Sequence, residues 1–131
     1  MTTQKKIVFV VEDEAPLRNA LVAKLEHEGF LTMTAKNGAD CFEMAVAHKP
    51  DLILLDIVMP VMGGMEAMKK LRAESEWGKH VPIILLTNLS PDSEDVMRFV
   101  TEQEPSFYLV KSNWKIEDVV EKVRERLGVA A

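Results

Sequence analysis

Short, unbroken runs of apolar residues recur along the chain, and they constrain the fold more than any other feature. In Asp51-Leu-Ile-Leu-Leu-Asp56, four apolar residues follow one another without a polar break. A strand with one face in water alternates apolar and polar residues, so such a run predicts a strand that is buried on both faces. Strands are predicted at 5–11, 30–35, 51–56, 81–87 and 106–110.

Segments with apolar residues at helical spacing follow the predicted strands. From the first helix to the fifth, the residues expected to face the core are Leu17, Leu21, Val22 and Leu25; Phe42, Ala45 and Val46; Met65, Met68 and Leu71; Val96, Met97 and Val100; and Ile116, Val119, Val120, Val123 and Leu127. The fourth helix has a specific start signal, since Ser90-Pro91-Asp92 supplies a cap, a proline at the first helical position and an acid. This alternation predicts a doubly wound α/β fold, a five-stranded parallel sheet with helices on both faces.

The composition is that of one globular domain. The chain has 131 residues, of which 47% are hydrophobic and 28% charged, enough for a single core. Its net charge of -5 argues against direct nucleic-acid binding. The apolar run at 7–11 is too short for the core of a signal peptide or for a membrane span. Because the single cysteine, Cys41, cannot form a disulfide within the chain, we expect a cytoplasmic protein.

Polar side chains stand at the carboxyl ends of four predicted strands. Glu12-Asp13 follows the first, Asp56 ends the third, Thr87 ends the fourth and Lys111 follows the fifth. Doubly wound folds bind ligands at this edge of the sheet. Two carboxylates about 4 Å apart repel by roughly 4 kcal/mol at an effective dielectric constant of about 20, and a divalent cation removes that penalty. Magnesium fits, because it binds through few carboxylates and keeps positions for water and phosphate oxygens.

In these residues the chain resembles the receiver domain of bacterial two-component response regulators. The resemblance extends over residues 5–127 and leaves 1–4 and 128–131 as short tails. Its motifs are specific in combination: Glu12-Asp13 after the first strand, Asp56 in DIVMPVMGG, Thr87 in ILLTN, and Tyr108 with Lys111 in FYLVK. The resemblance implies a flavodoxin-like sheet with strand order 2-1-3-4-5, in a signalling domain that is not an enzyme.

The resemblance also implies a phosphoryl acceptor and a metal site. Asp56 would accept a phosphoryl group from a sensor histidine kinase or a phosphotransfer protein. Asp13, Asp56 and the backbone carbonyl of Val58 would bind Mg²⁺, and Glu12 would help to hold it through a water molecule. Phosphoryl transfer depends on positioning and charge neutralisation, so a strand that holds Asp56 rigidly suits a nucleophile. The chain then breaks at Pro60 and Gly63-Gly64, which clears room for the metal and the donor.

A conformational switch follows from the same resemblance. Thr87 and Lys111 would hold the phosphoryl oxygens, and Tyr108 would swing inward on activation. The face made by the fourth helix, the fifth strand and the fifth helix would then contact a downstream protein. No direct contact with nucleic acid or membrane is expected.

The lifetime of the phosphorylated state can be predicted from three residues near the expected acceptor and switch positions. Val58 and Leu89 lie two positions beyond the acceptor Asp and the switch Thr, where receivers flank the approach of water, and neither can orient a water molecule. Asn88 stands at a position where receivers usually have a small residue, and it further narrows the access of water to the phosphoryl group. We therefore expect slow self-dephosphorylation. A second departure is Ser112, where receivers usually have a proline after the lysine.

Other protein classes fit the residues less well. A flavodoxin-like FMN carrier needs a hydroxyl-rich phosphate loop, and Glu12-Asp13-Glu14 would repel that phosphate. A haloacid-dehalogenase-type phosphatase needs a second Asp two residues after the first, where this chain has Val58. A dinucleotide enzyme would need a G-x-G-x-x-G motif, which the sequence lacks. The remaining alternative is a receiver-like protein-interaction module without phosphate turnover.

Overall fold

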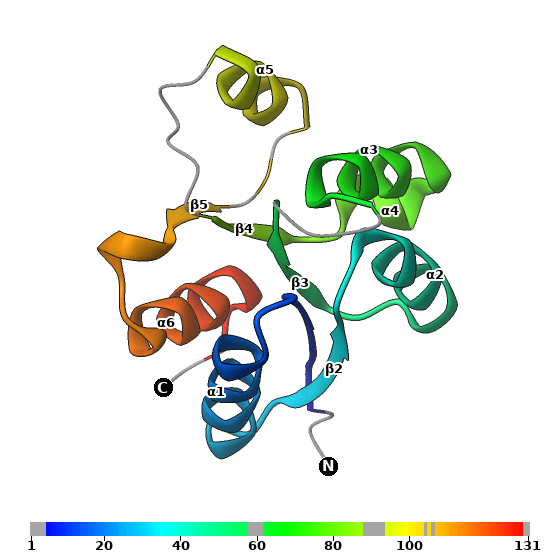
Figure 1. The fold of residues 1–131 in the computed structure, drawn as a ribbon. Helices are drawn as coiled ribbons and strands as arrows, with labels where there is room; N and C mark the ends of the chain where they lie inside the picture. The colour runs from blue at the N-terminus through cyan, green and yellow to red at the C-terminus, as the bar shows by residue number, and fades with distance from the viewer. Residues whose placement is uncertain (1–4, 58–61, 88–93, 104, 106, 130–131) are drawn as a thin grey trace.

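The computed structural model describes residues 5–57, 62–87, 94–103, 105 and 107–129. Its strands are β1 (Ile7–Val11), β2 (Leu31–Ala35), β3 (Leu52–Asp56), β4 (Ile83–Thr87) and β5 (Phe107–Val110). Neighbouring strands are parallel and follow the order β2-β1-β3-β4-β5 (Figure 1). The predicted doubly wound α/β fold and its strand order are confirmed.

The helices connect the strands and cover both faces of the sheet. They are α1 (Ala15–His27), α2 (Gly38–His48), α3 (Gly64–Glu74), α4 (Glu76–His80), α5 (Glu94–Gln103) and α6 (Ile116–Leu127), with a 3₁₀ turn η1 (Lys111–Asn113) after β5. The predicted fourth and fifth helices are therefore α5 and α6. The short helix α4 was not predicted, because five residues are too few to show an apolar helical period. Its start is marked by a cap, in which the Ser75 hydroxyl accepts a hydrogen bond from the amide of Gly78 at 3.1 Å.

Alternate residues of each strand face opposite layers of the core. In β3, Ile53 and Leu55 pack in the layer of α2, α3 and α5, whereas Leu52 and Leu54 pack in the layer of α1 and α6. Figure 1 shows α1 and α6 on one side of the sheet and α2 and α3 on the other. Burial on both faces explains why these strands carry no polar break.

Most of the predicted helical core residues lie as expected, but the fourth predicted helix is an exception. The predicted residues of the other four helices are buried in the two layers or packed against them. In α5, Met97 was expected to face inward and is instead 50% exposed, while Phe99 is only 3% exposed. Successive helical residues are rotated by about 100°, so Met97, two positions before the buried Phe99, lies on nearly the opposite side of the helix and faces away from the core. The predicted start at Ser90-Pro91-Asp92 and the side chain of Val96 lie outside the described residues.

Two glycines allow the chain to pack tightly after β3. The amide of Gly64 donates to the carbonyl of Ile57 at 2.8 Å, and a Cβ on Gly64 would lie 2.1 Å from the backbone oxygen of Asp56. The amide of Gly38 donates to the carbonyl of Met62 at 2.7 Å, and a Cβ there would lie 2.4 Å from that oxygen. Helices α2 and α3 can therefore begin directly against the segment that follows Asp56.

Candidate functional site

The carboxyl ends of four neighbouring strands supply the polar residues of the site. β3 ends at Asp56, which lies opposite Leu86 in β4, and β4 ends at Thr87, which lies opposite Val110 in β5. Glu12 continues from β1, and its amide donates to the carbonyl of Ala35 at 3.1 Å. The parallel order of the strands therefore places these residues at one edge of the sheet.

Three carboxylates meet at this edge. Glu12, Asp13 and Asp56 each offer an oxygen, and these oxygens all lie within 4.8 Å of one another. Glu12 is 2% exposed and Asp56 4% exposed, whereas Asp13 is open to solvent. Among the residues that the structure describes, the buried Oε2 atom of Glu12 has no hydrogen-bond partner. A buried, unpartnered carboxylate oxygen beside two more carboxylates is a donor set that suits a hard divalent cation.

The ammonium group of Lys111 partly neutralises this cluster. Its Nζ lies 2.5 Å from Oε1 of Glu12, 3.2 Å from Oδ2 of Asp56 and 3.4 Å from Oε1 of Glu14. Burial alone would lower the pKa of Lys111, but the hydrogen bond to Glu12 and the charges of Asp56 and Glu12 raise it above its ordinary value. Lys111 is therefore positively charged, and it is held beside the carboxylate that was predicted to be the nucleophile.

Burial acts in the opposite sense on Glu12. The pKa of Glu12 is raised to about 8, chiefly by burial and also by the hydrogen bond with Asp56, while Lys111 opposes the increase. The positive charge of Lys111 therefore does not fully offset the cost of burying the Glu12 carboxylate in its charged form. A second cation at the cluster would supply it.

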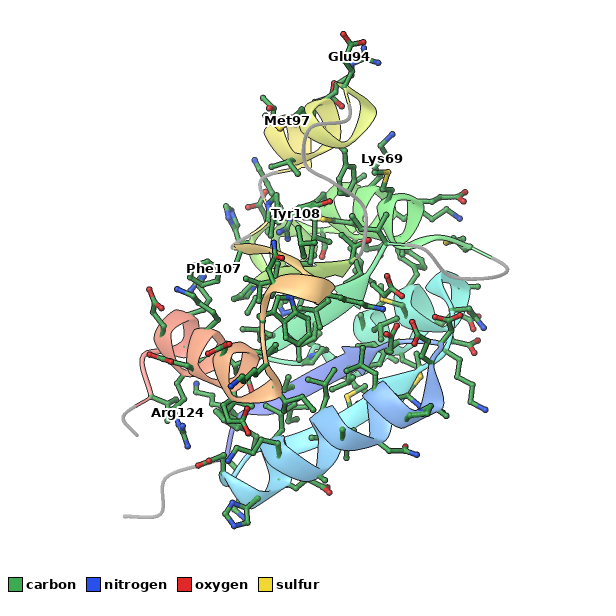
Figure 2. The ribbon with its side chains drawn as sticks, turned by 60° about the vertical axis from the view of Figure 1, so that its left-hand side comes forward. Lys69, Glu94, Met97, Phe107, Tyr108 and Arg124 are labelled. Carbon is green, nitrogen blue, oxygen red and sulfur yellow. The ribbon has the colours of Figure 1, made fainter. Side chains whose placement is uncertain are left out.

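The two predicted switch residues occupy different environments. Thr87 is fully buried at the end of β4. Tyr108 on β5 is half-buried against the layer of α2, α3 and α5, and burial raises the pKa of its hydroxyl. Its neighbour Phe107 packs in the opposite layer, with α1 and α6 (Figure 2). Tyr108 therefore lies on the side of the sheet that α5 covers.

Part of the predicted site falls on residues that the structure does not describe. Val58, whose carbonyl was predicted to bind the metal, and Asn88 and Leu89 lie outside the described residues. The position after Lys111 can be assessed: among the described residues no peptide bond is cis, so the Lys111–Ser112 bond is trans. Lys111 opens the 3₁₀ turn η1.

Sequence reasoning missed two residues that contact the site. Glu14 reaches the ammonium of Lys111 from the segment between β1 and α1. Arg18, in the first turns of α1, donates from Nη1 to the backbone carbonyls of Glu12 and Asp13. Strand-end positions did not reveal them, because both reach the site through long side chains. The spacing of Glu14 and Arg18, one turn apart after the acids, was the available signal.

Comparison with known proteins gives a consistent result. A family model described as the response regulator receiver domain matches residues 8–124. The DNA-binding response regulator MtrA of Mycobacterium bovis is 35% identical over 127 residues, which is 97% of this chain and 53% of that protein. The probable transcriptional regulator ycf27 of Porphyra purpurea is 38% identical over 89 residues, 68% of this chain and 35% of that protein. The chain spans about half the length, or less, of these curated relatives.

Solved structures agree with the sequence relatives. The receiver domain of the sensor histidine kinase PA1611 from Pseudomonas aeruginosa, with a magnesium ion coordinated in its active site cleft, has a TM-score of 0.82 at 26% identity over 95% of this chain and 99% of that one. The chemotaxis protein CheY4 of Vibrio cholerae has a TM-score of 0.82 at 25% identity over 93% of this chain and 98% of that one. Within the described part of this chain, no helix has the length and apolarity to cross a bilayer.

Proposed function

Because this chain belongs to the response regulator receiver domain family, we propose that it accepts a phosphoryl group on Asp56 from a histidine kinase or a phosphotransfer protein. The observation that carries the proposal is the position of Asp56 at the end of β3, with the Lys111 ammonium 3.2 Å from Oδ2 and two more carboxylates beside it. In the reaction, a carboxylate oxygen of Asp56 forms a bond to phosphorus as the bond from phosphorus to the donor nitrogen breaks. The domain is a signalling acceptor and not a turnover enzyme.

The charges of the site fit this chemistry. Transfer develops negative charge on the phosphoryl oxygens, and fixed positive groups stabilise it. Lys111 supplies one such charge, and the hydroxyl of Thr87 is the proposed second contact to the phosphoryl group. Support for this proposal comes from the full burial of Thr87 and from the Lys111 ammonium, which lies 3.2 Å from Oδ2 of Asp56.

We propose Mg²⁺ as the cofactor. Glu12, Asp13 and Asp56 would hold it, together with the carbonyl of Val58, which lies outside the described residues. The unpartnered Oε2 of Glu12 supports the fit. When bound, the ion supplies positive charge that lowers the barrier to attack by one anion on another.

The output is proposed to pass through a protein-docking face on α5, β5 and α6. Thr87 would be drawn towards the phosphoryl group and Tyr108 would move into the space that it leaves, so that phosphorylation favours one of two arrangements. The partner is a downstream protein, and the site of action is proposed to be cytoplasmic. Chemical-shift changes on adding the phosphate mimic beryllofluoride should fall on this face.

We retain slow self-dephosphorylation as a proposal. It rests on Val58, Asn88 and Leu89, none of which the structure describes. The double variant Val58→Asn with Leu89→Glu is expected to lose its phosphoryl group faster than the parent in the presence of Mg²⁺. Decay at the same rate in both proteins would refute control of water access by these side chains.

Mass spectrometry of the intact protein tests the central proposal. After incubation with acetyl phosphate and Mg²⁺, the parent should gain one phosphoryl group and Asp56→Asn none. Glu43→Gln, which removes an exposed carboxylate from α2, is the matched control and should be labelled like the parent. Full labelling of Asp56→Asn would disprove the assignment of the acceptor. A folded parent that binds Mg²⁺ but is never labelled would favour an interaction module without phosphate turnover.

A further inference from the structure

One guanidinium group bridges the backbone of two residues of the acidic cluster. Nη1 of Arg18 lies 2.9 Å from the carbonyl oxygen of Glu12 and 3.4 Å from that of Asp13. These are the two residues that bring carboxylates to the cluster from the end of β1. Arg18 is half-buried, and its own amide donates to the carbonyl of Glu14 at 2.9 Å. The arginine is thus anchored in α1 and reaches back to the strand end.

The segment that Arg18 holds is short. Residues 12–14 connect β1 to α1, so few dihedral angles determine where the two carboxylates point. The amide of Glu12 still pairs with the carbonyl of Ala35 across the sheet. The carbonyl of Glu12 lies one residue beyond the end of β1. A buried carbonyl requires a hydrogen-bond donor, and the guanidinium of Arg18 provides one. Arg18 therefore supplies hydrogen bonds to this segment from the helix side.

Arg18 and Lys111 bring positive charge to the cluster in different ways. Lys111 binds the carboxylate oxygens of Glu12 and Asp56 themselves, where a metal ion would also bind. The hydrogen bonds of Arg18 to this segment go to backbone carbonyls. It can hold the segment in place without competing with a cation for carboxylate oxygens. Groups that orient the ligands of a metal in this way commonly change metal affinity by about 10- to 100-fold.

We infer that Arg18 is a positioning residue of the cation site, which aligns the carboxylates of Glu12 and Asp13 for a divalent, oxygen-preferring ion. The inference rests on the proposed function, since it takes the acidic cluster to be a metal site. It predicts that loss of the guanidinium weakens Mg²⁺ binding even where all three carboxylates remain.

Titration calorimetry with Mg²⁺ on the purified full chain tests this role. Arg18→Met should raise the Kd for Mg²⁺ by about 10-fold. Arg18→Lys keeps the charge and one donor group, and it should restore part of the affinity. Arg72→Met is the matched control, because Nη1 of Arg72 makes the same kind of contact elsewhere, at 2.9 Å from the carbonyl of Gly78 and 2.8 Å from that of Val81. It should lower the melting temperature in EDTA without changing the Kd.

The outcomes separate this inference from the proposed function. If the parent binds Mg²⁺ and folded Arg18→Met binds it with the same Kd, the positioning role is overturned and the metal site stands. Equal weakening by Arg72→Met would also overturn it, since the effect would then be general destabilisation. A parent that does not bind Mg²⁺ would overturn the metal site and the inference together. If Arg18→Met does not fold, the test rests on Arg18→Lys. An unchanged Kd for Mg²⁺ in that variant would then count against the positioning role of Arg18.

Discussion

Replacing Asp13 by Asn should make the protein more stable without metal and less stable with it. The oxygens of Asp13 and Asp56 lie no more than 4.8 Å apart. Asp13 is exposed, and the lysine at the centre of the cluster contacts Glu12, Glu14 and Asp56. Asparagine at position 13 would therefore remove a repulsion while leaving those contacts of Lys111 in place.

The size of the effect follows from this separation. Two unit charges 4.8 Å apart repel by about 3.5 kcal/mol at an effective dielectric constant of about 20, and by about 0.9 kcal/mol in water. Because Asp13 is exposed to solvent, the repulsion energy lies near the lower of these two values. Burial raises the pKa of Glu12 to about 8, so near neutral pH Glu12 adds little and only the pair with Asp56 counts. The expected gain is about 1 kcal/mol, or roughly 4 °C in melting temperature.

Added Mg²⁺ should reverse the order. A ligand that binds only the folded state stabilises it by RT ln(1 + [L]/Kd), about 2.7 kcal/mol at 100 times the Kd. The parent should gain this amount, whereas Asp13→Asn, with one ligand lost, should gain far less. Thermal and urea unfolding at low salt, in EDTA and then in Mg²⁺, would measure both effects.

The matched control for this experiment is Glu43→Gln, which changes the net charge equally on an exposed turn of α2. It should leave the free energy of unfolding nearly unchanged under both conditions. The reasoning is refuted if Asp13→Asn is less stable than the parent in EDTA. It is also refuted if Mg²⁺ stabilises the variant as strongly as the parent.

Three further outcomes are expected. Gly64→Ala should lower the free energy of unfolding in urea by about 1–3 kcal/mol or more, because its Cβ would lie 2.1 Å from the last carbonyl oxygen of β3; an unchanged midpoint would contradict that close approach. Cys41 should resist a thiol reagent in the native protein and react only on unfolding, because it is buried and burial raises its pKa to about 12; rapid native labelling would count against this. Hydrogen bonds from Lys24 and then Arg124 lower the pKa of Glu28, so its stabilising contribution is present above the ordinary glutamate pKa and is lost as pH falls through the lowered value. Glu28→Gln should therefore be less stable than the parent at pH 7 and equally stable in strong acid, and a difference that persists in acid would exclude the ion pairs as its cause.

Strand assignments were predictable because a strand that is buried on both faces has an unbroken run of apolar residues. Leu52 to Leu55 could be placed from their unbroken apolarity alone, and the position of Asp56 at a sheet edge follows from the strand it ends. The orientation of α5 was less predictable. Met97 and Phe99 are both apolar, and only packing against the sheet decides which of them is buried.

The contacts of the site were harder to predict than its members. Strand ends indicated which acids converge, since parallel strands bring their carboxyl ends to one edge. Which partner each charge selects depends on the reach of flexible side chains. Glu14 and Arg18 extend back from the start of α1, and their spacing of one turn does not by itself predict that direction.

The hydrogen bond from Lys111 to Glu12 joins residues that are 99 positions apart in the chain. Contacts between such distant segments are slow to form, because the entropy of closing the loop between them is lost before the contact is gained. A molecule in which β5 has not yet joined the sheet would hold its acids without their ammonium partner. Under the proposed function, a short pulse of acetyl phosphate during refolding would mark only the molecules whose last strand is in place. The fraction of molecules labelled on Asp56 at each refolding time would then measure the fraction that has completed folding.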